Sequence, residues 1–214
     1  FHPFPHMKQS YSLHALVFMI FCSSAALAFT VLPQNDWEIA KNQNGIKVFT
    51  RKNSGEMKEY RGETTIAASI DDVFNLLNKF ENYASWMPSC LENKVIKRIS
   101  ETELYQYNVT DAPWPVSDRD SVIKTKITKQ TSGVIMIELS AAPDYIPEKS
   151  GRVRVPSFKG YWKLTPKDAN NTQVVYEGKP SAGGSIPAWL ANSSVIDVPF
   201  NTLDEIKSRL AKKK

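Results

Sequence analysis

Apolar and polar positions repeat with two different periods along this chain. Residues 45–50 and 59–66 alternate between apolar and polar side chains, the period of a β-strand with one buried face. From Ser69 the spacing becomes helical: Ser69 is a suitable N-cap, and Asp72 three residues later completes a capping-box-like signal. The pattern therefore predicts strands followed by one helix. The apolar positions of that helix, three and four residues apart, are Val73, Leu76, Leu77, Phe80 and Ala84.

The remainder of the chain predicts a series of strands and then a second helix. Short polar turns separate the strand-like segments, as in an antiparallel meander. The segments are 94–99, 103–109, 121–128, 133–141, 152–165 and 172–177. One longer connection, residues 143–151, contains two prolines and one glycine and predicts an ordered loop of the kind that often carries function.

The last segment, residues 186–210, predicts a long amphipathic helix. Ser185 is its cap, and Pro187 lies in the first turn, where a missing N–H costs little. An amphipathic helix must bury its apolar stripe, and the concave face of a curved sheet is the available partner. We therefore predict an α+β fold in which a curved antiparallel β-sheet wraps around the C-terminal helix.

The front of the chain has the pattern of an export signal. Met7 is a plausible initiator, with extra residues before it, and residues 15–22 form a short apolar run. The small-x-small pattern at 26–28 resembles a cleavage site, so we expect residues 1–28 to be a secretory signal peptide. The alternative is an uncleaved N-terminal membrane anchor that continues through Leu32. A cleaved signal predicts a periplasmic or secreted protein with one domain, residues 29–214.

Removal of the signal would leave a chain without histidine. His2, His6, His14 and Cys22 all lie in the first 28 residues, and Cys90 is the one remaining thiol. This composition excludes Ser-His-Asp and Cys-His catalytic sites, histidine-ligated zinc and cysteine-cluster metal sites. We expect no metal, no cofactor and no internal disulfide.

The charge of the chain is mildly basic. The formal net charge is +5, and Lys8 of the predicted signal contributes one of these charges. The lysines at 212–214 end the chain, and no basic stripe is interleaved with aromatic residues, so we expect no nucleic acid partner. The tail is either solvated or in contact with anionic lipid headgroups.

Four stretches together resemble the START family of lipid-transfer domains, in the same order along the chain. They are "NYASWMPSC" at 82–90, "PWPVSDRD" at 113–120, "APDYIPEKSGRVRVPSFKGYWKLTP" at 142–166 and "GGSIPAWLANSSVIDVPFNTL" at 183–203. The resemblance covers about residues 37–210 and implies the helix-grip fold, a curved sheet that grips the long helix and encloses a hydrophobic tunnel. Members bind sterols, phospholipids or other apolar molecules.

Strand parity identifies a polar residue for the interior of that tunnel. Arg119 shares a face with Ile123 and Ile127, whereas the lysines of this strand lie on the other face, so Arg119 is expected to point inward. A buried guanidinium needs a partner, and the resemblance also implies a charged pair there. We favour Glu138. The other candidates are Asp118, Asp120 and Glu103, and a surface network of Arg119 with the two aspartates is the alternative.

The same parity argument nominates residues for the tunnel wall. The strand candidates are Tyr105, Tyr107, Trp162 and Tyr176, and the helix candidates are Trp189, Asn192, Ser193, Ile196 and Phe200. Ordinary core packing is the competing explanation for the aromatic residues. Asn192 and Ser193 are either hydrogen-bonding partners for a ligand headgroup or solvated residues near the helix start.

We expect a non-enzymatic monomer that binds and transfers a hydrophobic ligand, with transient contact to a membrane surface. The tunnel would be gated by the C-terminal helix and the 143–151 loop. The rival is a cyclase or aromatase-like enzyme that uses Arg119 with Tyr105, Tyr107 and Glu138 on a polyketide-like substrate. A third possibility is a protein-interaction module with a filled core, which the volume of the cavity would distinguish.

Overall fold

The computed structural model describes residues 36–54 and 57–211. The predicted signal at 1–28 and the lysine tail at 212–214 lie outside these residues. The front and back boundaries of the domain predicted at 29–214 therefore fall outside the described part.

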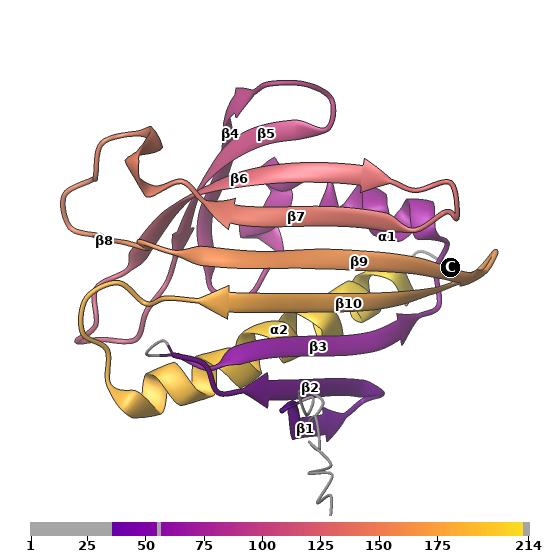
Figure 1. Ribbon diagram of the computed structural model, residues 1–214, viewed down its shortest axis with the longest axis horizontal. Helices are drawn as coiled ribbons and strands as arrows, with labels where there is room; N and C mark the ends of the chain where they lie inside the picture. Colours follow the sequence, from indigo (N-terminus) through magenta and orange to yellow (C-terminus); the bar gives the residue numbers. More distant parts are fainter. Residues whose placement is uncertain (1–35, 55–56, 212–214) are drawn as a thin grey trace, which may run out of the picture. The chain divides into compact units, whose positions relative to one another are not determined.

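Within the described residues, ten strands form one sheet. They are β1 (Glu38–Gln43), β2 (Ile46–Arg51), β3 (Glu59–Ile66), β4 (Cys90–Arg98), β5 (Glu103–Thr110), β6 (Arg119–Lys129), β7 (Ile135–Ala141), β8 (Val153–Arg154), β9 (Phe158–Asp168) and β10 (Asn171–Pro180). The order across the sheet is β1-β2-β3-β10-β9-β7-β6-β5-β4, and the neighbours along it are antiparallel (Figure 1). The short β8 pairs with β6 in parallel.

Four helical segments accompany the sheet: α1 (Ile70–Leu77), η1 (Phe80–Ser85), η2 (Pro143–Tyr145) and α2 (Ala188–Ala211). The helices α1 and α2 lie behind the strands in Figure 1. The short η2 lies on the opposite face, where Tyr145 stacks on Tyr105. Ser69 caps α1, because its side chain accepts a hydrogen bond from the Asp72 backbone N–H. The predicted α+β helix-grip architecture is confirmed: an open antiparallel sheet holds a long C-terminal helix.

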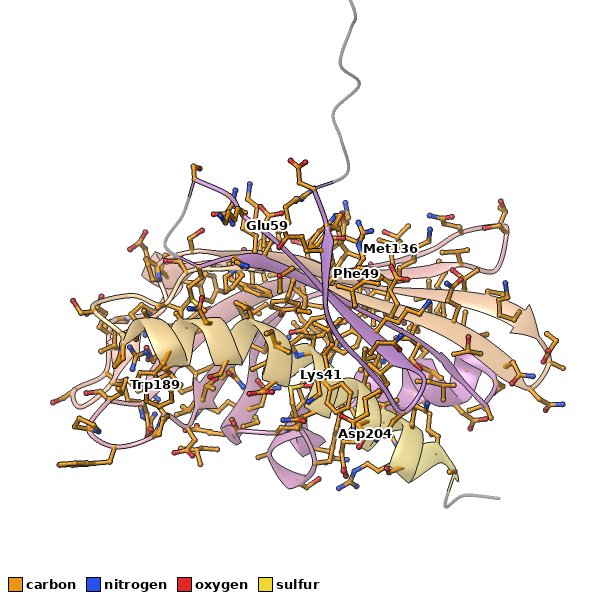
Figure 2. All side chains as sticks on the ribbon, turned by 90° about the horizontal axis from the view of Figure 1, so that it is seen from below. Lys41, Phe49, Glu59, Met136, Trp189 and Asp204 are labelled. Atoms are coloured by element: carbon orange, nitrogen blue, oxygen red, sulfur yellow. The ribbon has the colours of Figure 1, made fainter. Side chains whose placement is uncertain are left out.

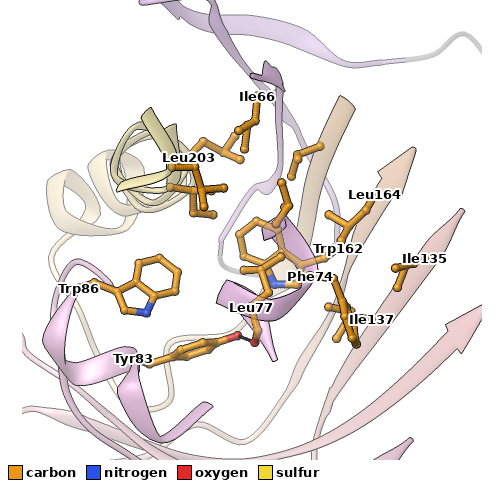
Figure 3. Close-up of a cluster of buried hydrophobic side chains, with 14 of the residues drawn as sticks. Ile66, Phe74, Leu77, Tyr83, Trp86, Ile135, Ile137, Trp162, Leu164 and Leu203 are labelled. Atoms are coloured by element: carbon orange, nitrogen blue, oxygen red, sulfur yellow. Dashed lines mark hydrogen bonds between the residues drawn. The ribbon is translucent and has the colours of Figure 1, made fainter. Parts of the chain in front are cut away.

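The core lies between the helices and the central strands (Figure 3). Leu203 and Ile206 of α2 are fully buried there. Gly62 of β3 lets α2 approach closely, because a Cβ at this position would lie 2.7 Å from Leu203 Cδ1 and 3.2 Å from Pro199 Cβ. The side chains of Leu203 and Pro199 therefore lie directly against the β3 backbone, which sets the height of α2 above the sheet.

Three elements differ from the expected pattern. The strand predicted at 152–165 is split into β8 and β9, because Pro156 has no N–H for the ladder. The first helix ends at Leu77, and the apolar spacing continues into η1, where the Tyr83 hydroxyl donates a hydrogen bond back to the Leu77 carbonyl. The edge strand β1 was not predicted, because its side chains are almost all exposed and carry no burial period.

Candidate functional site

A cavity of about 320 Å³ lies between α2 and the concave face of the sheet. Its apolar wall comes from the central strands and from α2. The residues are Ile137, Leu139, Trp162, Tyr176, Leu190, Val195 and Val198. Neighbouring strands β4, β5 and β6 form a polar wall, with Asn93, Gln106, Asn108, Thr110, Arg119 and Ser121.

Part of the polar wall is a buried network of neutral side chains. Asn93 Nδ2 donates to the Phe80 carbonyl and to Gln106 Oε1, each at 2.8 Å. Gln106 Nε2 donates in turn to Thr125 Oγ1 at 2.8 Å. These bonds fix the orientation of both amides, because each amide nitrogen faces an acceptor. Asn93 Oδ1 is left without a donor among the described residues.

Arg119 lies on the cavity wall, where strand parity placed it. Its guanidinium donates a hydrogen bond to the Ser117 carbonyl and makes no ion pair with a carboxylate of the described residues. Burial lowers the pKa of Arg119, and the charge of Asp118 opposes this shift only partly. The guanidinium is therefore a partly desolvated cation that no carboxylate of the described residues contacts directly.

The prediction that Glu138 pairs with Arg119 is wrong. The side chain of Glu138 is exposed, and its neighbours Ile135 and Ile137 face the core instead. Both faces of this strand carry apolar residues, so the alternation alone did not show which face is inside. Among the described residues, the most deeply buried ion pair is instead made by Asp120, the residue after Arg119, whose carboxylate receives two hydrogen bonds of 2.9 Å from Arg154.

Tyr105 and Tyr107 lie on the outer face of the sheet and not on the cavity wall. Tyr105 stacks on Tyr145 at a ring-centroid distance of 3.9 Å, and Tyr107 is fully buried with its hydroxyl 2.8 Å from Arg152 NH1. The segment after β7 covers this outer face, so both faces of β5 are partly buried and parity alone could not choose between them. The sequence argument missed the uncharged polar residues of β5 that alternate with these tyrosines and line the cavity. They are Gln106, Asn108 and Thr110.

Trp162 and Tyr176 line the cavity, as predicted for the tunnel wall. Their rings are stacked with centroids 3.9 Å apart, and Tyr60 meets Tyr176 edge-on at 5.2 Å. Burial raises the pKa of both tyrosines, so their hydroxyls stay neutral. This aromatic group gives the apolar wall a rigid surface.

The cavity-facing side of α2 is rotated from the predicted one. Trp189 is 62% exposed at the first turns of α2 (Figure 2), Asn192 is exposed and Ser193 is half-buried. None of the three lines the cavity. Ile196 packs against the core, and Phe200 is buried with Lys41 Nζ 3.7 Å from its ring centroid. Phe200 thus lies in the core, next to Lys41 of the unpredicted edge strand β1, and not on the cavity wall. The α2 residues that line the cavity are Leu190, Ser194, Val195, Val198 and Thr202.

The 143–151 loop does not line the cavity, so its predicted place at the gate is wrong. Ile146 packs on the outer-face cluster around Tyr107. Arg154 binds the loop at the Pro143 and Ile146 carbonyls while it pairs with Asp120. The loop is thus fastened to the outer face of the sheet by a buried guanidinium.

Other classes of site have little support in the described part of the chain. The described residues contain no group of three or more His, Cys, Asp or Glu side chains that could hold a metal ion. The constellation considered for an enzyme is not assembled, because Tyr105, Tyr107 and Glu138 lie outside the cavity that contains Arg119. None of the helices in residues 36–54 and 57–211 is long and apolar enough to cross a membrane.

Comparison with known proteins gives a consistent set of similarities. The START domain profile matches residues 32–214. An uncharacterized protein of Pseudomonas aeruginosa is 40% identical over 179 residues, which are 83% of this chain and 88% of that protein. The phosphatidylcholine transfer protein of Mus musculus is 24% identical over 178 residues, covering 78% of this chain and 80% of the relative.

A solved structure is similar over nearly the same region. It is the STAR-related lipid transfer protein (fragment 25–204) from Xanthomonas axonopodis, with a TM-score of 0.76 and 41% identity. The match covers 82% of this chain and 99% of that one. The residues that the START domain profile matches include every element that lines the cavity.

Proposed function

Because the chain belongs to the START domain family, we propose that it binds a hydrophobic ligand between α2 and the sheet and carries it between membranes. The observation that carries this proposal is the cavity of about 320 Å³ with a mainly apolar wall. Small-molecule sites have volumes of about 300–1,000 Å³, and a filled core of a pure interaction module would leave no such space. Similar proteins whose names describe lipid transfer support the same function.

We place the ligand entrance at the N-terminal end of α2. The wall there includes Ile186 and Leu190 from the helix side and the exposed Pro113 from the loop before β6. Gly183 and Gly184 precede this end with positive φ angles of 64° and 57°, a backbone conformation that favours glycine. Rearrangement of this short connection would move the start of α2 without disturbing its buried C-terminal half.

We further propose that this end contacts a membrane. Trp114 and Trp189 are 92% and 62% exposed, and each is next to a residue of the cavity wall. Amphipathic indole rings favour the membrane–water interface. With the export signal predicted at residues 1–28, the membranes would be those that face the periplasm or the cell exterior.

A cavity-filling substitution tests ligand binding. Ser194 is half-buried on the cavity wall, so Ser194→Phe should occupy part of the ligand volume. Native mass spectrometry after mild extraction should detect a retained lipid-sized ligand on the wild type and a loss of most of that ligand on the variant.

Asn192→Phe is the matched control, because Asn192 is exposed on the same helix and outside the cavity wall. It should retain the ligand as the wild type does. A wild-type protein that never retains a ligand, or equal retention by both folded variants, would contradict the proposal.

A further inference from the structure

The charge on the cavity wall is asymmetric. Among the described residues that line the cavity, only Arg119 and Asp111 carry a formal charge. Asp111 is exposed and makes no ion pair with Arg119. The partly buried charge facing the cavity is therefore a positive one.

The nearby acids are engaged elsewhere. Asp118 accepts a hydrogen bond from the Ala112 backbone N–H at 3.2 Å, which holds the turn before β6. Asp120 points to the opposite face and is paired with Arg154. Neither carboxylate neutralises the Arg119 guanidinium by direct contact.

The guanidinium keeps most of its hydrogen-bonding capacity. An arginine has five N–H donors, and within the described residues Arg119 uses one group, NH1, for the Ser117 carbonyl. Ser121 follows on the same face of β6, and its hydroxyl makes no hydrogen bond to another described residue. Free donors on a cation, with a hydroxyl on the same cavity wall, suit a bidentate anion such as a carboxylate or phosphate.

The apolar part of the wall suits one hydrocarbon chain. Arg119 is at the first residue of β6, and Leu139, Ile137 and Trp162 continue the wall across the central strands. The volume of about 320 Å³ is at the low end of the range for small-molecule sites, which favours a single chain over two long chains.

We propose that the cavity selects a single-chain amphiphile with an anionic head, whose carboxylate or phosphate binds Arg119 while its chain lies along the apolar wall. This inference rests on the proposed function and specifies the class of ligand. A carboxylate head would come from a fatty acid, and a phosphate head from a monoacyl phospholipid.

Three ligands with the same hydrocarbon chain test the proposal on the full chain. They are oleic acid, oleoyl lysophosphatidic acid and oleyl alcohol, whose dissociation constants are measured by titration below the micelle concentration. The wild type should bind at least one anion about tenfold or more tightly than the alcohol, because a hydrogen-bonded charge pair is lost with the alcohol. The stronger of the two anions identifies the source of the head.

Arg119→Gln should weaken binding of the preferred anion about tenfold or more and change binding of the alcohol by less than about twofold. Arg119→Lys keeps the charge and should bind the anion more tightly than Arg119→Gln. Arg98→Gln is the matched control, because Arg98 is an exposed arginine on β4 outside the cavity wall. It should leave all three constants unchanged.

The wild-type comparison does not depend on the folding of any variant. Equal wild-type affinity for alcohol and anions, or an equal loss for all three ligands in folded Arg119→Gln, would overturn the inference and leave the proposed function standing. If the wild type binds none of the three but retains another ligand in native mass spectrometry, the inference alone fails. If it binds none and retains nothing, the proposed function fails with it.

Discussion

Two adjacent residues, Arg119 and Asp120, have opposite roles because a strand turns successive side chains to opposite faces. Arg119 faces the cavity, and no carboxylate in residues 36–54 and 57–211 forms an ion pair with it. Asp120 is 1% exposed on the outer face, where Arg154 meets it with two hydrogen bonds and also holds the 143–147 segment. The charge of Arg119 is thus available to a ligand, whereas the charge of Asp120 stabilises the fold.

Asp120→Asn should destabilise the domain strongly. The change would leave the buried Arg154 without its counter-charge, a loss of about 3–5 kcal/mol in the free energy of unfolding. Chemical denaturation measures this effect. Glu103→Gln removes a partner of the more exposed Lys124 on the same sheet and should cost about 0–1 kcal/mol. If the two variants lost similar amounts of unfolding free energy, the buried pair would stabilise the domain no more than the exposed pair does.

The Asp120–Arg154 ion pair makes the stability of the domain depend on pH. Burial alone would raise the pKa of the Asp120 carboxyl, but hydrogen bonds from Arg154 and Tyr107 and the charge of Arg154 outweigh it and lower the pKa below its ordinary value. The contribution of Asp120 is therefore complete above the unfolded-state pKa of about 4 and is lost as the pH falls through the folded-state value. Stability of the wild type should decrease below about pH 4 more steeply than that of Asp120→Asn.

At the scale of the elements, α2 has two unequal halves. Its buried residues begin at Val195, and none of residues 188–194 is buried. Leu203, Ile206 and Leu210 in the second half pack into the core. The half that borders the proposed entrance is therefore attached by fewer buried contacts, which lowers the cost of opening it.

Amide hydrogen exchange should resolve this difference. Residues 188–194 are expected to exchange faster than residues 202–211, and bound ligand should slow the first segment more than the second. The 143–151 loop should respond little to ligand, since it is fastened to the outer face by Arg154. Equal protection along all of α2 would argue against an entrance at its N-terminal end.

At the scale of the whole molecule, the exposed Trp114 and Trp189 are each next to a residue of the cavity wall. Figure 2 shows Trp189 by the first turns of α2, while Glu59 lies on the other side of the sheet. A membrane contact through Trp114 and Trp189 would bring the proposed entrance to the lipid surface. Binding and release would then occur in one orientation of the protein.

The double variant Trp114→Ala/Trp189→Ala should reduce association with lipid vesicles by about tenfold and leave ligand retention unchanged, because the two side chains are exposed. Vesicle sedimentation and native mass spectrometry measure the two properties. Ile99→Ala is the control, since Ile99 is 54% exposed in the turn between β4 and β5. Vesicle binding that falls equally with the control would refute a specific contact.

The local pattern of the sequence determined most of the elements and the fold. Period-two and helical spacing predicted the meander, the N-cap at Ser69 and the long final helix, because these features depend on residues a few positions apart. Parity also grouped Arg119 correctly with the inward residues of β6. The motifs were sufficient to indicate the START family.

Only the tertiary structure decided which groups meet at the cavity. A strand buried on both faces has no polar side to mark its exterior, so parity paired Tyr105 with Tyr107 but could not place them outside the cavity. The partner of Asp120 is 34 residues away, and the side of α2 that faces the cavity depends on how the helix packs against β2 and β3. Contacts between distant segments depend on which segments cover the sheet and on where α2 crosses it. The spacing of neighbouring residues in the sequence determines neither of these.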